Sequence, residues 1–486
     1  MSDAVVVGAG PNGLAAAVTL ARAGLSVKVY ELASQLGGGT RSAALTLPGF
    51  LHDVCSAVHP MALASPFFQE FGLAERMELR VPEVSYAHPL DDGRAGIAYR
   101  DLNRTVAELG RDGAAYRRLF APLLARVEGI TDFTQHPLLR IPADPIAAFR
   151  YALAVAEQGS LLGDLRFRGE AAPAMIAGVS AHSIGKIPSL ATAGAGLLLG
   201  TLAHAGGWPV PIGGSQAIAD AMAADFSAHG GEIVLNHRVE SLAQLKAETG
   251  AKIQLLDVSA SGLLEIAGTE LPSRFIRSLR RFRYGPGACK VDFALSGPVP
   301  WTNPELAAVA TLHLAGTKAE IARSEAQVAA GQHPEQPYVL VSQPSPHDAS
   351  RAPLGQQVLW SYCHVPAGST VDMTEAVVRQ IERFAPGFRD VVLASKVITA
   401  AEYAHYNPNY IGGDFSAGAV TIRQLLKRPV VSARPWRTPI PGLYLGSSST
   451  APGPSVHGLC GWYAAQTALK DVYGLAAPDL SPSDAL

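Results

Sequence analysis

The sequence opens with a glycine motif whose spacing could bind a dinucleotide. The motif follows the pattern Gly-x-Gly-x-x-Gly and consists of Gly8, Gly10, Pro11, Asn12 and Gly13. The first glycine permits a tight turn, the second lets the backbone approach a pyrophosphate, and the third allows a helix to pack closely on a strand. Glu31 follows about 20 residues later, where a carboxylate suits a ribose diol. Together these residues predict a dinucleotide-binding site.

A second glycine cluster favours FAD over NAD as the nucleotide. Gly38, Gly39 and Arg41 belong to residues 36–42, just beyond the acidic residue. The backbone of this segment can approach the diphosphate and ribityl chain, and the guanidinium can neutralise phosphate charge. The sequence contains no second nucleotide fingerprint of the kind that would indicate NAD(P).

The elements around these motifs form a strand–helix–strand unit. Residues 4–7 are an apolar run typical of a buried strand, residues 14–23 an alanine- and leucine-rich helix, and residues 27–30 a second strand. Such a unit predicts a right-handed crossover between parallel strands. The glycine turn then lies at the end of the first strand and Glu31 at the tip of the second.

The rest of the chain alternates between helical and strand-rich stretches, which predicts two interleaved domains in an α/β fold. Residues 66–205 show several helical patterns and few strands, whereas the chain becomes β-rich from residue 289 and ends in a strand and a helix. We expect a Rossmann-type FAD-binding domain from residues 1–65, 211–283 and 430–486. We expect an α+β substrate domain from residues 66–210 and 284–429.

Composition excludes several classes of protein. The 486 residues carry a net charge of −2, which argues against a nucleic-acid partner, and they are only 16% charged and 48% apolar. Four dispersed cysteines make neither a disulfide framework nor a metal site, and the N-terminus shows no leader pattern, so a cytoplasmic location is expected. The high apolar content fits a large core and an apolar substrate. Peripheral membrane contact and homo-oligomers are both compatible with it.

Three stretches resemble bacterial flavoproteins related to phytoene desaturase, within the flavin amine oxidase superfamily. They are ELASQLGGGTRSAALTLPGFLHDVCSAVHP, PIGGSQAIADAMAADFSAHGGEIVLNHRVESL and GLYLGSSSTAPGPSVHGLCGWYAA. The resemblance covers the chain in order and is most specific at its two ends. The last loop departs from the family, because residues 451–455 replace a frequent His-Pro-Gly-Gly-Gly run, which weakens any assignment to true carotenoids.

The resemblance implies that FAD is bound without a covalent link and assigns residues to each of its parts. The motif glycines would meet the diphosphate, Glu31 the adenosine ribose, and the second cluster with Arg41 the phosphates and ribityl chain. Val239 would contact adenine through its backbone. The ribityl chain and flavin ring would be held by four residues before the last helix, namely Gly446, Ser447, Ser455 and Val456.

Four residues are candidates for catalysis. Lys290 lies in a segment that resembles the amine-oxidase strand whose lysine holds a water near flavin N5; the alternative is an ordinary strand lysine facing solvent. His59 could be a general base and His457 could approach the flavin edge, but either could be a hydrogen-bonded structural residue. Tyr410, with Asp414, could face the substrate cavity or simply form a turn.

The predicted function is that of an FAD-dependent oxidoreductase. The resemblance implies hydride transfer from a carbon of an apolar small molecule to flavin N5, with oxygen or a quinone as the electron acceptor. Flavin amine oxidation is the alternative, and it would require an aromatic pair that the sequence near Trp462 and Tyr463 does not identify. A second alternative is a non-catalytic scaffold that flavin stabilises.

Overall fold

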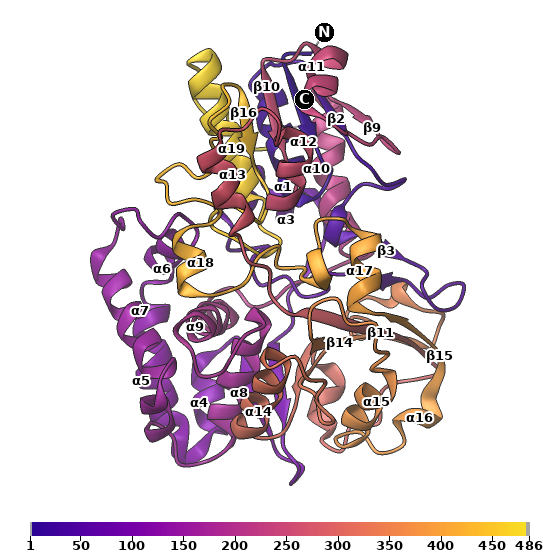
Figure 1. Ribbon diagram of the computed structural model, residues 1–486. Coiled ribbons are helices and arrows are strands. Elements are labelled where there is room, and N and C mark those ends of the chain that lie inside the picture. The colour runs from indigo at the N-terminus through magenta and orange to yellow at the C-terminus, as the bar shows by residue number, and fades with distance from the viewer. Residues whose placement is uncertain (1, 483–486) are drawn as a thin grey trace.

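A five-stranded parallel sheet forms the upper part of the computed structural model, which describes residues 2–482 (Figure 1). Its strand order is β16-β10-β1-β2-β9. The strands come from three separate parts of the chain: β1 (Ala4–Val7), β2 (Val27–Tyr30), β9 (Glu232–Val234), β10 (Ile253–Leu256) and β16 (Leu443–Leu445). Because all pairings are parallel, the carboxyl ends of these strands share one edge.

Helices cover both faces of this sheet, as a parallel sheet requires. Ala4 and Val6 of β1 face one core, which α1 (Pro11–Arg22), α10 (Gln216–Ala228) and α19 (Leu459–Ala468) complete. Val5 and Val7 face a second core, which α11 (Leu242–Thr249), α12 (Ala260–Ala267) and α13 (Ser273–Arg280) complete. The alternation of buried side chains along β1 thus fixes the strand between two helical layers.

A seven-stranded sheet lies below, with the order β15-β11-β14-β13-β12-β6-β7. Its strands are β6 (Val84–Pro89), β7 (Ala95–Tyr99), β11 (Gly287–Leu295), β12 (Thr311–Leu314), β13 (Val339–Ser342), β14 (Gln357–Val365) and β15 (Val392–Ile398). All its pairings are antiparallel except that of β12 with β6. One face packs on α15 (Thr374–Glu382) and α16 (Phe388–Val391) through an apolar core.

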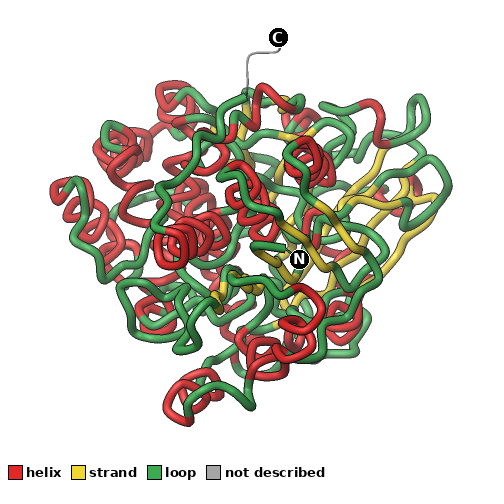
Figure 2. The backbone as a smooth tube through the Cα atoms, turned by 90° about the horizontal axis from the view of Figure 1, so that it is seen from above, coloured by secondary structure: helices red, strands yellow, loops and turns green. Residues whose placement is uncertain are grey.

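Helices gather beside this sheet, on the left in Figures 1 and 2. They are α4 (Leu102–Glu108), α5 (Gly113–Leu124), α6 (Val127–Thr134), α7 (Pro145–Gln158), α8 (Ala171–Ser180) and α9 (Leu190–Ala205). The central helix, α9, contacts α5, α6, α7 and α8. No helix within residues 2–482 is both long and apolar enough to cross a membrane.

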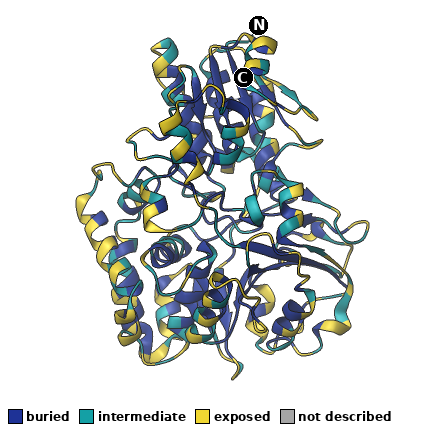
Figure 3. Ribbon diagram, in the orientation of Figure 1, coloured by how far each residue is buried: buried dark blue, intermediate teal, exposed yellow. Residues whose placement is uncertain are grey.

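Short elements connect these layers. The helices among them are α2 (Pro66–Phe71), α3 (Leu73–Arg76), α14 (Lys318–Ala329), α17 (Ala400–Tyr406) and α18 (Ile422–Leu426). The strands are the pairs β3 (Ser42–Ala43) with β4 (His52–Asp53), and β5 (Leu79–Arg80) with β8 (Val210–Pro211). Figure 3 shows buried residues concentrated in both sheets and in α9, and exposed residues along the outer edge of α7.

The predicted α/β class is confirmed. The few strands expected between residues 66 and 205 include β6 and β7, which form a hairpin that completes the second sheet. Within this stretch α5 and α6 are separate helices, because Arg126 between them leaves the helical conformation at φ −135° and ψ 32°. Proline at position 122 also weakens the end of α5.

Candidate functional site

A cavity of about 1170 Å³ lies between the two sheets and begins at the carboxyl edge of the parallel sheet. Such an edge is where open α/β sheets bind their ligands. Fourteen of the residues predicted from the sequence line it: Gly8, Gly10, Pro11, Asn12, Glu31, Gly38, Gly39, Arg41, Val239, Tyr410, Ser447, Ser455, Val456 and His457. Gly13, Gly446, His59 and Lys290 do not line it.

Glycines at this edge leave room that no other residue could leave. A Cβ atom on Gly38 would lie 2.9 Å from the Cα of Gly10, so the two backbone segments could not approach each other with side chains. A Cβ atom on Gly39 would collide with the hydroxyl of Tyr410. The N-terminus of α1 follows at once, and its N–H groups favour an anion. The arrangement fits a dinucleotide diphosphate.

Glu31 sits at the tip of β2 with both oxygens hydrogen-bonded. Oε2 accepts from Ala9 N–H at 2.8 Å, and Oε1 accepts from Ala33 N–H at 2.8 Å. These bonds fix the carboxylate at the cavity wall, and each oxygen can still accept a ribose hydroxyl. His237 stacks on Tyr30 at a centroid distance of 4.1 Å beside this position, and both rings line the same end of the cavity.

Arg41 is positioned by the second glycine cluster that its own segment forms. Its Nε donates to Gly38 O at 3.0 Å, and its guanidinium lies 4.4 Å from the centre of the Tyr406 ring. The Tyr406 hydroxyl donates to the same carbonyl at 2.8 Å. The guanidinium is therefore held rigidly in the cavity wall, where a phosphate could pair with it.

The loop after β16 brings the C-terminal residues to the cavity. Ser447, Ser455 and Val456 line it, whereas Gly446 serves packing, since a Cβ there would lie 2.8 Å from Leu255 Cδ2. Ser455 has φ +133°, a conformation that glycine adopts easily and other residues rarely adopt. The loop that departs from the glycine-rich family pattern thus has a backbone conformation at Ser455 that favours glycine.

His457 lines the cavity, but its ring is committed to the backbone of its own loop. Nδ1 accepts from Leu459 N–H at 3.1 Å, which leaves Nε2–H to donate to Gly453 O at 3.2 Å. Burial lowers the pKa of His457 to about 4, so the ring is neutral at physiological pH. These contacts suit a residue that shapes the loop. Each ring nitrogen would have to break its hydrogen bond before it could accept or donate a proton in catalysis.

Two buried charged residues shape the same loop. Arg428 donates to Ser448 O at 2.7 Å and to Ser416 O at 2.6 Å, and burial lowers the pKa of this guanidinium to about 10. Asp414 accepts from the N–H groups of Gly285 and Ser416 at 2.7 and 2.9 Å. Asp414 does not line the cavity, so its observed role is turn formation. The sequence carried no signal for Arg428, because its partners are carbonyl oxygens.

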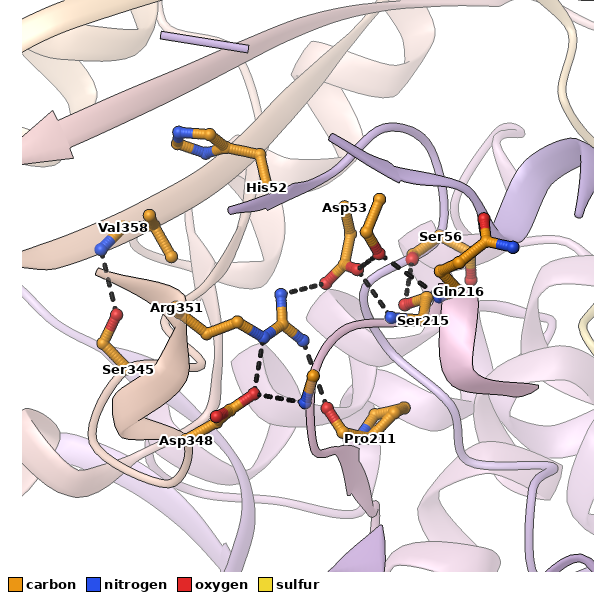
Figure 4. A network of polar contacts seen from close by, with 12 residues as sticks. His52, Asp53, Ser56, Pro211, Ser215, Gln216, Ser345, Asp348, Arg351 and Val358 are labelled. Atoms are coloured by element: carbon orange, nitrogen blue, oxygen red, sulfur yellow. Dashed lines mark hydrogen bonds and ion pairs between the residues drawn. The ribbon is translucent and has the colours of Figure 1, made fainter. Parts of the chain in front are cut away.

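His59 contacts a buried polar network that Figure 4 shows around Arg351, Asp53 and Ser215. Its Nε2 donates to Ser215 Oγ at 2.7 Å, since that hydroxyl donates to Ser56 O at 2.7 Å. Burial lowers the pKa of His59 to about 4, although Asp53 opposes this effect. The ring is therefore neutral. Val58 and Pro60 on either side of His59 line the cavity but His59 itself does not, and its general-base role stays a prediction.

Arg351 is the centre of that network. The guanidinium donates to Asp53 Oδ2 at 3.0 Å, to Asp348 Oδ2 at 2.7 Å and to Pro211 O at 3.2 Å. Although burial works against ionisation, Arg351 and the N–H of Ser215 hold the pKa of Asp53 below its usual range. The network ties the loop between β13 and β14 to the segment that precedes α10.

Lys290 lies on β11 and is completely buried, so it does not face solvent. Its ammonium pairs with Asp292 on the same face of the strand, and it lies 5.8 Å from the centre of the Trp360 ring. His52 Nδ1 approaches the other oxygen of Asp292 at 3.5 Å. Burial lowers the pKa of Lys290, and Asp292 opposes this effect. Its action at a flavin stays a prediction.

The end of the cavity that lies away from the parallel sheet is apolar. It is lined by Phe133, Tyr151, Val155, Leu190, Leu198, Leu199, Leu340, Trp360, Tyr362, Phe415, Val420, Ile422 and Leu425. None of the lining residues from positions 66–210 and 284–429 is Asp, Glu, Lys or Arg. Trp462 and Tyr463 pack instead in the core around α1. The four cysteines are free and buried.

Comparisons with known proteins agree with this geometry. A sequence model described as flavin-containing amine oxidoreductase matches residues 12–466. The rat pyridine nucleotide-disulfide oxidoreductase domain-containing protein 2 is 26% identical over 97% of this chain and 94% of its own length. The neurosporene-forming phytoene desaturase of Rhodobacter capsulatus is 28% identical over 57% of this chain and 52% of its own. An engineered putrescine oxidase shares the fold, with a TM-score of 0.59, 15% identity and coverage of 97% and 99%.

Proposed function

The chain belongs to the flavin-containing amine oxidoreductase family and its cofactor is FAD; from this premise we propose that it dehydrogenates an apolar small molecule. Bound FAD supplies the hydride acceptor for such chemistry. The glycine edge, Glu31 and Arg41 would hold the cofactor, while the apolar end of the cavity would orient the substrate carbon and exclude water. We expect oxygen or a quinone as the final electron acceptor.

The residues that line the apolar end of the cavity are the main support for this proposal. A primary amine is cationic near neutral pH, and its burial without a carboxylate would be costly even beside the aromatic rings of Trp360 and Tyr362. The four carboxylic acids that line the cavity are Glu31, Glu240, Asp257 and Glu265. All four come from the parts of the chain that build the parallel sheet, so the apolar end offers an ammonium group no counter-ion. An apolar substrate meets no such cost.

Anaerobic mixing of the holoprotein with two matched compounds tests the proposal. One is a linear isoprenoid hydrocarbon dispersed in detergent, and the other is a primary alkylamine of the same chain length. We expect loss of the visible flavin absorbance with the hydrocarbon alone. Bleaching by the amine alone would instead indicate an amine oxidase. A flavin that only dithionite reduces would indicate a non-catalytic scaffold.

Exposed apolar side chains occur on several segments that also contribute to the cavity lining, and they suggest where the substrate comes from. We name these residues the apolar rim: Leu139, Ile141, Ile146, Phe149, Leu153, Leu161, Leu162, Leu165, Leu190, Ile422, Leu426 and Val431. Leu190 and Ile422 also line the cavity, so the apolar surface continues inward. Isolated exposed apolar residues are normal, whereas a contiguous group marks a contact surface.

We propose that the apolar rim contacts a membrane surface from which the substrate enters. Basic residues support this choice, because Arg150, Lys186 and Arg423 lie among the rim segments and form no ion pair within residues 2–482. Exposed cations beside apolar side chains are suited to an anionic lipid surface. A second copy of the chain is the competing occupant, and it would appear as a concentration-dependent dimer in the absence of lipid.

A further inference from the structure

Asp257 lies at the glycine edge of the FAD site, although no sequence motif marks it. It follows β10, whose Leu256 is paired with Val7 of β1, so the two strands end side by side. A Cβ atom on Gly10 would lie 3.0 Å from Asp257 Oδ2, and one on Gly13 would lie 3.2 Å from it. The carboxyl group therefore borders the turn at which the backbone approaches a pyrophosphate.

One oxygen of this carboxyl group already accepts a hydrogen bond from a backbone N–H group of α1. Oδ2 accepts from Gly13 N–H at 2.9 Å. The first turn of a helix has few such donors, and Pro11 contributes none. Oδ1 has no hydrogen-bond partner within residues 2–482, and Asp257 lines the cavity. One oxygen is thus anchored to the helix, and the other is available to a ligand.

Arg41 and Arg238 line the same cavity, but within residues 2–482 no cationic side chain pairs with Asp257. Glu31 at the end of β2 repels it, and Glu265 of α12 lines the same end of the cavity. The glycine turn carries no titratable side chain, and α19 contributes Cys460, whose pKa burial raises to about 12. Burial raises the pKa of Asp257 to about 7, the hydrogen bond from Gly13 opposes this shift, and Glu31 adds to it.

We propose that Asp257 binds the FAD diphosphate as a neutral carboxylic acid, accepting from Gly13 N–H through Oδ2 and donating its own O–H to a phosphate oxygen. An ionised carboxylate would stand beside both the diphosphate and Glu31 with no cation between them. Only the acid offers a donor in place of a repulsive charge. The proposal depends on the FAD site alone and not on which substrate is oxidised.

Cofactor binding must then take up a proton whenever Asp257 is ionised in the FAD-free protein. Binding of FAD raises the affinity of Asp257 for its proton, and by reciprocity loss of the proton lowers the affinity for FAD. Binding is therefore unaffected by pH well below the pKa of the FAD-free protein. It weakens as the pH rises above that value, by up to about tenfold per pH unit.

Dialysis of the holoprotein measures this dependence without any turnover. The dissociation constant of FAD is obtained from retained flavin absorbance at intervals from about pH 6 to about pH 9. We expect it to rise by at least about tenfold over this range for the wild type. The Asp257→Asn variant keeps an acceptor for Gly13 N–H and a donor for phosphate but does not titrate. Its dissociation constant should vary by less than about threefold.

Two further variants complete the test. His237 also lines this end of the cavity, so His237→Gln is the control and should retain the slope that Asp257 produces. If Asp257→Asn fails to load FAD, Asp257→Ser replaces it, since a hydroxyl can also accept and donate without titrating. A constant wild-type dissociation constant would overturn the proposal. So would a pH slope that survives either substitution of Asp257.

Discussion

The backbone of Ser455 is strained, and its side chain does not offset the energetic cost. At φ +133° it occupies a region that L-residues rarely adopt, and such positions cost about 1–3 kcal/mol. The resemblance implies glycines in this loop, and the structure gives Ser455 a backbone conformation of the kind that favours glycine. Strain of this kind is tolerated where the surrounding contacts fix the loop, here those of Arg428 and His457.

We predict that Ser455→Gly stabilises the protein by about 1 kcal/mol, because relief of strain exceeds the added entropy of the unfolded chain. Urea unfolding of the holoprotein, followed by circular dichroism, measures the change. Ser447→Gly is the control, since Ser447 does not have a positive φ and its hydroxyl accepts from Ser449 N–H at 3.2 Å. That control should destabilise. Equal destabilisation by both substitutions would contradict the strain argument.

Arg351 is the residue whose loss should cost most stability. Removing one member of a buried ion-pair network leaves uncompensated charge and costs about 3–5 kcal/mol. We therefore expect Arg351→Met, which leaves Asp53 and Asp348 without this cation, to lower the free energy of unfolding by about that amount. Arg389→Met is the matched control, because Arg389 pairs with Glu375 and Glu382 at the surface, where a pair contributes about 0–1 kcal/mol. If chemical denaturation gave similar losses of unfolding free energy for Arg351→Met and Arg389→Met, the distinction between buried and surface ion pairs would be refuted.

At the scale of elements, the sequence predicted what is local and missed what depends on distant partners. The β1–α1–β2 unit could be predicted because its periodicity, glycine spacing and acidic residue all lie within the first 31 residues. The strands β7 and β15 were missed, since their short or half-exposed sequences become strands only through pairing with β6 and β11. Asp257 and Arg351 were missed for the same reason, because their partners lie far away in the sequence.

Helix α7 exposes an apolar stripe where a surface helix normally has polar residues. Ile146, Phe149 and Leu153 recur at helical spacing and are 53%, 64% and 55% exposed, while Ala147 and Tyr151 of the other face are buried. Both faces of the helix are therefore apolar. One packs against α9 and the other belongs to the apolar rim.

We predict that Phe149→Glu with Leu153→Glu weakens binding to vesicles of phosphatidylglycerol and phosphatidylcholine by tenfold or more. Each substitution replaces apolar area by a charge that an anionic surface repels. Co-sedimentation of the holoprotein with the vesicles measures binding, and retained FAD absorbance shows that the variant is folded. Leu354→Glu is the control, because Leu354 is fully exposed and lies outside the rim. If the wild type does not sediment with vesicles, or if both variants bind as it does, the membrane proposal fails.

At the scale of the whole molecule, buried neutral histidines connect the layers. Burial lowers the pKa of His59, His88, His204 and His457 to about 4 and that of His182 to about 3. Most of them bridge separate elements, His457 excepted; His182 Nε2, for instance, lies 2.8 Å from His313 Nε2 across the gap between the helices and the second sheet. Each ring is held neutral by the folded state but titrates near 6.5 in the unfolded chain.

Stability should therefore fall steeply in mild acid. Above about pH 6.5 the histidines are neutral in both states and stability does not depend on them. As the pH falls from there towards about 4, the unfolded chain takes up protons that the folded state refuses, and each histidine lowers the free energy of unfolding by up to about 1.4 kcal/mol per pH unit. Asp257, whose pKa is raised to about 7, works in the opposite direction but is a single group.

We predict that the urea midpoint of the holoprotein, measured with excess FAD, drops sharply below about pH 6. His59→Gln should reduce the slope of the free energy of unfolding against pH in acid by up to about 1.4 kcal/mol per pH unit. The reason is that the variant takes up one proton fewer when it unfolds. His333→Gln, at an exposed position, should leave the slope unchanged. A midpoint that is constant down to about pH 5 would show that these rings accept protons in the folded state. In that case the interior between the sheets would have to be far more hydrated than its packing indicates.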